Sequence, residues 1–214
     1  VAFGRQYLAD PDFLIKAREG RPEDIRKCIA CNQGCIERLI LGEGKIRCAL
    51  NPETGQEIIY PQWPAGIRRN VWVVGAGPGG LTAAFEAARL GHQVTLFEKE
   101  DETGGQLRFA SKAPFKDHYG VWASWLTAQV EKMGVILRTG TEVTESMLSE
   151  GNPDAVILAS GGKQVKPDIP GIDLPLVHNA WQVLDGAVPP GKHTAVIGGG
   201  LIGMETADTL CQKG

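Results

Sequence analysis

The sequence has 214 residues, of which 43% are hydrophobic and 22% charged, with a formal net charge of −3. These values are those of an ordinary soluble globular protein, and they exclude the global basic field that would attract nucleic acid or an anionic membrane. No apolar run approaches the roughly 20 residues of a membrane-spanning helix and no signal-peptide pattern is present, so we expect a cytoplasmic protein.

The first 27 residues are polar and mixed, and the segment after them is rich in Cys, Pro and Gly. Pro22-Glu23-Asp24 predicts the start of a helix, because Pro fits the first turn and the helix dipole favours acidic residues there. We expect this short helix to run into Cys28. Residues 28–69 hold the cysteines and then a connector rich in Pro and Gly, which predicts irregular loop structure.

Four of the five cysteines lie close together, in the pattern C-x2-C-x3-C-x12-C formed by Cys28, Cys31, Cys35 and Cys48. Without export signals, a metal or cluster site is favoured over disulfides. Three close thiolates and a distant fourth can supply the ligands of a [4Fe–4S] cluster, which we predict here. A Zn(Cys)4 site is the alternative, although zinc sites more often show two matched C-x2-C pairs. Cys211 is predicted to be a packed thiol.

Strands and helices alternate from residue 71 onward. The spacing of apolar residues predicts strands at 71–74, 94–97, 135–138 and 155–159, with helices at 81–90 and 117–133. The unbroken apolar runs at 71–74 and 155–159 are typical of strands buried on both faces of a parallel sheet. The alternation therefore predicts the α/β class, with a doubly wound parallel sheet.

The first strand leads into a glycine-rich motif. Residues 75–80 fit G-x-G-x-x-G through Gly75, Gly77 and Gly80. These glycines would permit the tight turn, the approach of a pyrophosphate and the packing of the helix on the sheet. Glu98 ends the next strand, where an acid accepts hydrogen bonds from the adenosine ribose. We predict a dinucleotide or ADP site here.

A second strand–glycine–helix unit begins at Thr194 and repeats the motif with Gly198, Gly200 and Gly203. We predict that it belongs to an NAD(P)H site, whose choice between NAD and NADP would be set by residues after position 214. Since the sequence begins with Val and stops inside this repeat, we expect a fragment that is inactive alone.

Together these features resemble the iron–sulfur flavoproteins related to old yellow enzyme, the family of 2,4-dienoyl-CoA reductase, trimethylamine dehydrogenase and histamine dehydrogenase. Phe3-Gly4-Arg5 and Ala9-Asp10-Pro11 look like the end of that family's FMN-binding (β/α)8 barrel. The cysteine segment, residues 73–80 and Gly104-Gly105-Gln106-Leu107 look like its cluster and FAD segments.

The resemblance implies four parts of the chain and a set of cofactor contacts. The parts are the barrel end (1–27), the cluster segment and connector (28–69), an incomplete FAD-binding domain (70–190) and the start of an NAD(P)H-binding domain (191–214). Gly4 and Arg5 would touch the FMN phosphate. The FAD contacts would be Gly79, Glu98, Gln106, Lys116 and Val143. The resemblance assigns no catalytic proton donor within this chain.

The resemblance also implies an activity. NAD(P)H would reduce FAD, and the electrons would pass through the cluster to FMN, which would reduce an activated C=C bond. One alternative is an amine dehydrogenase with ADP in the first nucleotide site. Another is a non-catalytic electron-transfer subunit like the small subunit of glutamate synthase, against which the barrel-end segment Gly4–Arg21 argues. A zinc-stabilised structural module is the fourth hypothesis, after the reductase, the amine dehydrogenase and the electron-transfer subunit. We expect a small-molecule substrate of the enoyl or amine type and no nucleic-acid or membrane partner. A homo-oligomer stays open as the assembly state.

Overall fold

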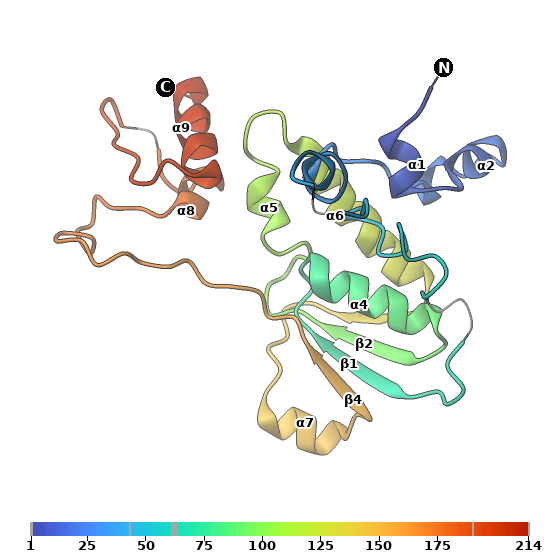
Figure 1. Cartoon of the computed structure of the whole chain (residues 1–214). Helices are drawn as coiled ribbons and strands as arrows, with labels where there is room; N and C mark the ends of the chain where they lie inside the picture. The colour runs from blue at the N-terminus through green and yellow to red at the C-terminus, as the bar shows by residue number, and fades with distance from the viewer. Residues whose placement is uncertain (1, 43, 61–63, 190, 214) are drawn as a thin grey trace.

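The computed structural model describes residues 2–42, 44–60, 64–189 and 191–213. At its centre is a four-stranded parallel sheet in the order β3-β2-β1-β4 (Figure 1). The strands are β1 (Asn70–Val74), β2 (Gln93–Phe97), β3 (Ile136–Arg138) and β4 (Ala155–Leu158). All four strands predicted before residue 190 are thus present, and the α/β class is confirmed.

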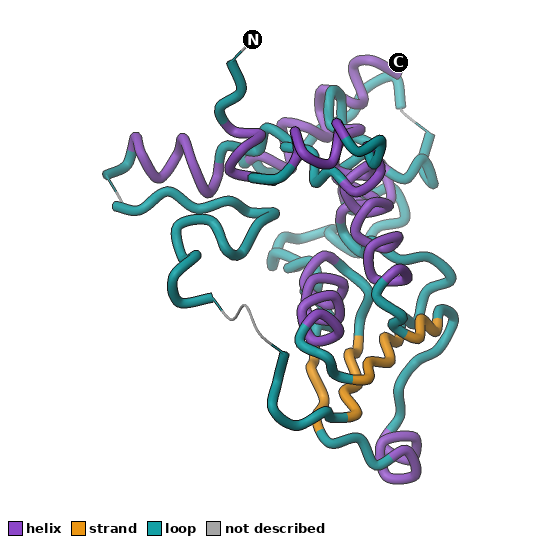
Figure 2. The backbone as a smooth tube through the Cα atoms, turned by 90° about the vertical axis from the view of Figure 1, so that its right-hand side faces the viewer, coloured by secondary structure: helices purple, strands orange, loops and turns teal. Residues whose placement is uncertain are grey.

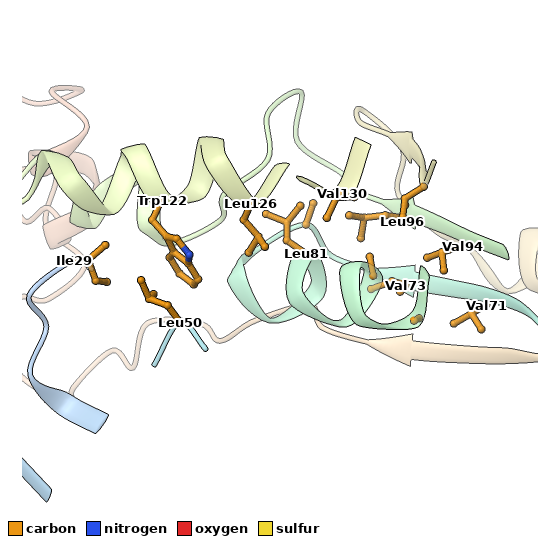
Figure 3. Packing of buried hydrophobic residues seen from close by; sticks show 14 residues of the cluster. Ile29, Leu50, Val71, Val73, Leu81, Val94, Leu96, Trp122, Leu126 and Val130 are labelled. Atoms are coloured by element: carbon orange, nitrogen blue, oxygen red, sulfur yellow. The ribbon is translucent and has the colours of Figure 1, made fainter. Parts of the chain in front are cut away.

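Two long helices cover one face of the sheet. They are α4 (Pro78–Arg89) and α6 (Asp117–Lys132), which also pack against each other (Figure 1). Val73, Leu81, Leu96 and Val130 are the largest fully buried side chains and lie between these layers (Figure 3). Both helices were predicted, because their apolar residues recur at helical spacing.

The opposite face of the sheet is covered less completely. The short helix α7 (Glu145–Gly151) lies there, and Gly151 packs against the ring of Trp72, where an added Cβ would come within 2.2 Å. β4 lies at the sheet edge, and its Val156 and Leu158 are 38% and 76% exposed. The prediction of β4 as a strand buried on both faces is therefore wrong, because within the described residues no second helix covers it.

The N-terminal region is folded into short helices. They are α1 (Arg5–Ala9), α2 (Phe13–Arg18) and the 3-10 turn η1 (Pro22–Asp24). The helix predicted to run into Cys28 is only this one turn. The helix ends there because Asp10 accepts the backbone N–H of Arg26 and Gln6 accepts that of Cys28. These hydrogen bonds hold the segment extended.

The cysteine segment and connector are mostly irregular, as predicted (Figure 2). The exception is a π-helical turn, η2 (Gln33–Glu37), that continues into α3 (Arg38–Ile40). Residues 61–63 of the predicted connector lie outside the described part of the chain.

The C-terminal part lies beside α5 (Leu107–Ala110) and away from the sheet (Figure 1). It holds α8 (Ala180–Leu184), which begins with a capping box between Asn179 and Gln182, and α9 (Leu201–Lys213). The rings of Phe109 in α5 and Trp181 in α8 stack with centroids 5.3 Å apart.

The strand predicted from Thr194 to Ile197 is absent. A parallel strand forms only when a neighbouring strand pairs with it, and residues 194–197 have none in the described chain. Helix α9 forms nonetheless, because its hydrogen bonds are internal to it. None of the helices in the described residues is both long and apolar enough to cross a membrane.

One ion-pair cluster joins the N-terminal region to α6. Lys132 Nζ lies 2.6 Å from Asp24 Oδ1, and Arg21 Nη1 lies 3.0 Å from Asp24 Oδ2. The hydrogen bond from Lys132, and then that from Arg21, lowers the pKa of Asp24 to about 2. Since the unfolded carboxyl titrates near 3.9, this pair stabilises the fold above about pH 4 and is lost as the pH falls toward 2.

We therefore expect Asp24→Asn to lower the free energy of unfolding at pH 6, by less than about 1 kcal/mol because Lys132 is half exposed. The difference from the unsubstituted protein should shrink as the pH falls from 4 to 2. Urea unfolding across this range measures it, with Asp168→Asn on an exposed loop as control. A difference that stays constant with pH would contradict the assignment.

Candidate functional site

The glycine-rich loop after β1 is built so tightly that two of its positions accept only glycine. Gly75 has φ +104°, and an added Cβ would lie 2.4 Å from the carbonyl oxygen of Ala159. A Cβ on Gly80 would lie 1.7 Å from the carbonyl oxygen of Gly75. Helix α4 starts directly behind this loop, and its N-cap Gly77 provides no side-chain cap. The first N–H groups of α4 are therefore available to an anion such as a phosphate.

A second glycine turn packs on this loop. Gly104 N–H donates to the carbonyl of Ala76 at 2.8 Å, and a Cβ on Gly105 would lie 2.9 Å from Gly77 Cα. Gln106 follows and its Nε2 donates to the carbonyl of Gly162, after β4, at 3.4 Å. The structure thus gathers Gly75, Gly77, Gly79, Gly80 and Gln106 at the carboxyl ends of β1 and β4. Since β1 has β2 on its other side, this is the topological switch point, where open α/β sheets bind ligands.

Glu98 is buried at the end of β2, beside the glycine-rich loop. Its Oε2 accepts the N–H of Ala76 at 2.7 Å and its Oε1 accepts the N–H of Glu100 at 3.1 Å. Each carboxylate oxygen keeps a second lone pair that can accept a hydroxyl hydrogen. Glu98 therefore fixes the loop and stays able to accept a hydrogen bond from a ribose.

Two further predicted contacts lie outside this cluster of glycines. Val143 is half-buried in the segment between β3 and α7. Lys116 precedes α6, and its ammonium forms an ion pair with Glu205 of α9, a residue just after the second glycine motif. No sequence pattern indicates this pair, because the two residues lie 89 positions apart.

The second glycine motif has the turn of the first although its strand is absent. Gly198 has φ +110°, and a Cβ on Gly203 would lie 1.9 Å from the carbonyl oxygen of Gly198. This repeats the relation between Gly75 and Gly80. Gly200 has no atom near an added Cβ, so its surroundings are open.

Because Lys116 and Glu205 are both half-buried, their pair helps to hold α9 against the start of α6. We expect Lys116→Met to speed amide hydrogen exchange in residues 201–213 about threefold to fivefold, which corresponds to the loss of about 0.6–1 kcal/mol. Glu205→Gln should do the same, and the double variant should add little more. Lys112→Met is the control, since Lys112 is an exposed lysine in the same loop between α5 and α6. Full additivity of the two substitutions would show that the pair has no energetic role.

The four clustered cysteines line one pocket. Arg5, Leu8, Ile29, Asn32, Gly34, Ala49 and Leu50 complete its lining. Asn32 lies in the left-handed region at φ +60°, which turns the chain between Cys31 and Cys35. Gly34 then packs on the irregular segment before Cys48, where a Cβ would lie 2.7 Å from the carbonyl oxygen of Arg47. Cys28 and Cys48, which are 20 residues apart in the sequence, thereby line the same pocket.

The pocket holds its sulfur atoms in a partly apolar setting with nearby backbone N–H groups. The N–H of Ala30 donates to Cys28 Sγ at 3.4 Å. Burial raises the pKa of the Cys48 thiol, while hydrogen bonds from the N–H groups of Leu50 and Asn51 oppose that rise. In the described residues, no three His, Cys, Asp or Glu side chains are grouped to hold a single metal ion. What the four cysteines bind stays a prediction.

The residues expected at an FMN phosphate lie at the edge of this pocket. Gly4 precedes α1 in the open, and the exposed Arg5 guanidinium donates a hydrogen bond to Asn32 Oδ1. Sequence reasoning missed two residues here. They are Gln6 and the buried Asp10, whose side chains bind the backbone before Cys28.

Known proteins match the chain along its whole length. The family model described as pyridine nucleotide-disulphide oxidoreductase matches residues 69–214. The NADH oxidase of Thermoanaerobacter brockii is 43% identical over 219 residues, which cover 100% of this chain and 34% of that protein. The N,N-dimethylglycine/sarcosine dehydrogenase of Chromohalobacter salexigens is 37% identical over 226 residues, which cover 100% of this chain and 32% of that protein.

A solved structure of 2-naphthoyl-CoA reductase in complex with 2-naphthoyl-CoA has the same fold. It superposes with a TM-score of 0.92 at 38% identity, covering 97% of this chain and 32% of the other. The chain therefore spans about a third of the length of the curated relatives it matches.

Proposed function

Since the chain belongs to the pyridine nucleotide-disulphide oxidoreductase family, we propose that it is the electron-relay part of an NAD(P)H-dependent reductase. Electrons would pass from NAD(P)H to FAD, then to a [4Fe–4S] cluster, and then to FMN, which would reduce an activated C=C bond. The similarity to a 2-naphthoyl-CoA reductase over 97% of the chain supports a conjugated, enoyl-type substrate.

The observation that carries the proposal is that the cysteine pocket and the glycine-rich loop share one hydrophobic core. Ile29 and Leu50 line the pocket and also pack in the core beside Trp122 of α6 (Figure 3). Cys31 and Cys48 pack against the same core, which continues to Leu81 behind the glycine-rich loop. A cluster and a flavin held here would be carried by one packed core, which would keep the distance between them constant.

The residues fit both groups. For FAD, Gly77 and Gly105 keep side chains away from the path of a pyrophosphate, and Glu98 can accept a ribose hydroxyl. For the cluster, four cysteines surround one pocket, and backbone N–H groups point at Cys28 and Cys48. Such hydrogen bonds to sulfur help to set a cluster's potential.

FMN would be held largely by parts of the longer protein, with Gly4 and Arg5 as this chain's contribution. Arg5 offers a planar fork of donors suited to a phosphate. A cytoplasmic location and a substrate that is neither nucleic acid nor membrane lipid are further parts of the proposal.

The second candidate is an amine dehydrogenase with ADP in the first nucleotide site. The similarity to an N,N-dimethylglycine/sarcosine dehydrogenase favours it. Relatives that match this chain from its barrel-end segment onward speak against the electron-transfer subunit.

The test is to measure iron, acid-labile sulfide, zinc and released flavins on the anaerobically purified intact protein. About four irons with FMN and FAD per chain are expected. Iron with FMN and ADP but no FAD would favour the amine dehydrogenase, and zinc without flavin would overturn both candidates.

A further inference from the structure

We propose that α1 positions the cysteine pocket and that Gln6 fixes the backbone of its first cysteine, Cys28. This inference rests on the proposed cluster. It assigns Gln6, Asp10, Asn51 and Thr54 as positioning residues, none of which is a cluster ligand.

The amide side chain of Gln6 makes both hydrogen bonds to the backbone around the first cysteine. Gln6 Oε1 accepts the N–H of Cys28 at 3.0 Å, and Gln6 Nε2 donates to the carbonyl of Arg26 at 3.0 Å. The two bonds bracket Lys27 as a neighbouring strand would. The side chain thus fixes the backbone on which Cys28 is carried.

Asp10, one turn further along the chain, secures the same segment. Its Oδ2 accepts the N–H of Arg26 at 2.9 Å and the ammonium of Lys16 at 2.7 Å, and its Oδ1 accepts the N–H of Asp12. The carboxylate is only 3% exposed, so removing these partners would leave a buried charge. Asp10 therefore fixes the backbone at Arg26, two residues before Cys28.

The segment that follows the last cysteine, Cys48, is hydrogen-bonded to the same helix. Asn51 Nδ2 and Thr54 Oγ1 donate to the carbonyl of Leu8 at 3.1 and 2.7 Å. Both side chains are buried, and Leu8 lies in the last turn of α1, where carbonyls have no partner within the helix. The segment after Cys48 therefore caps α1.

The middle cysteines are tied to α1 as well, through the hydrogen bond from Arg5 to Asn32 between Cys31 and Cys35. One five-residue helix thus contacts every cysteine-bearing segment, and none of these contacts involves a sulfur ligand. Because α1 also carries Arg5, expected at the FMN phosphate, it would fix the cluster relative to the acceptor flavin. Gln6 and Thr54 act at opposite ends of this arrangement and can be tested separately.

The test uses Gln6→Leu and Thr54→Val in the intact holoprotein. Gln6→Leu leaves the N–H of Cys28 and the carbonyl of Arg26 without partners, and Thr54→Val removes a donor to Leu8 at nearly constant volume. We expect each to release iron to the chelator ferrozine about tenfold faster than the unsubstituted protein. The EPR signal of the reduced cluster should broaden, while the FAD content stays unchanged because neither residue touches the glycine-rich loop.

Gln212→Leu, the same exchange on the exposed end of α9, is the matched control and should release iron at the unsubstituted rate. If Gln6→Leu fails to fold, Thr54→Val decides the question alone. Iron release at the unsubstituted rate from the folded variants overturns the role of α1 but leaves the cluster in place. An unsubstituted protein without iron and sulfide would instead overturn the proposed function.

Discussion

Replacing Cys48 by alanine should remove the proposed [4Fe–4S] cluster from the intact protein. The iron content should fall from about four per chain to less than one, since three thiolates remain for a site that needs four. The proposed reduction of a C=C bond by NAD(P)H should fall at least a hundredfold, while FAD should stay bound, because the glycine-rich loop makes its own contacts with Glu98 and the 104–105 turn. Metal analysis, flavin analysis and steady-state rates measure these effects.

Cys211→Ala is the matched control for this experiment. The prediction that Cys211 is a packed thiol is wrong, because this residue is exposed on α9. It lies outside the residues that line the cysteine pocket, so its loss should change neither iron nor rate. A Cys48→Ala protein that keeps four irons and full activity would show that Cys48 is not a ligand.

Replacing Gly80 by alanine should abolish binding in the first nucleotide site. The new Cβ would lie 1.7 Å from the carbonyl oxygen of Gly75, which belongs to the backbone and cannot turn aside. Helix α4 would have to move off the sheet, which displaces the N–H groups expected at the pyrophosphate. We expect FAD to fall from about one per chain to a trace, and the free energy of unfolding to fall by about 3 kcal/mol.

Gly66→Ala makes the same chemical change in the loop before β1. An added Cβ there meets no atom within 4 Å, so FAD content and stability should stay close to those of the unsubstituted protein. Flavin fluorescence after denaturation and urea unfolding test both variants. A Gly80→Ala protein with full FAD would contradict the tight turn described above.

Much of the fold follows from local sequence. The apolar run at 71–74 and the helical spacing of Leu81, Ala84 and Ala88 identify a strand and a helix without reference to the rest of the chain. The glycines at 75 and 80 identify the turn between them, since their positions are fixed by backbone geometry that only glycine allows. The predicted cysteine ligands also come from spacing alone.

The errors have one physical origin, which is that the partners of a segment are distant in sequence. The run at 194–197 has the composition of a strand, but strand hydrogen bonds need a neighbour and the described chain supplies none. Val156 and Leu158 are apolar, yet their exposure depends on whether a helix covers that face. Residues 25–28 stay extended because Gln6 and Asp10 bind their backbone.

The sequence by itself determined the alternation of strands and helices, both glycine turns and the four cysteines, because each depends on spacing within a few residues or on a side chain's own chemistry. Only the tertiary structure decided that these cysteines line one pocket beside α1, that this pocket shares a core with the glycine-rich loop, and that Lys116 pairs with Glu205. The Lys116–Glu205 pair joins residues 89 positions apart, and local propensities cannot encode such contacts. They form only when the packing of the apolar core brings those segments together.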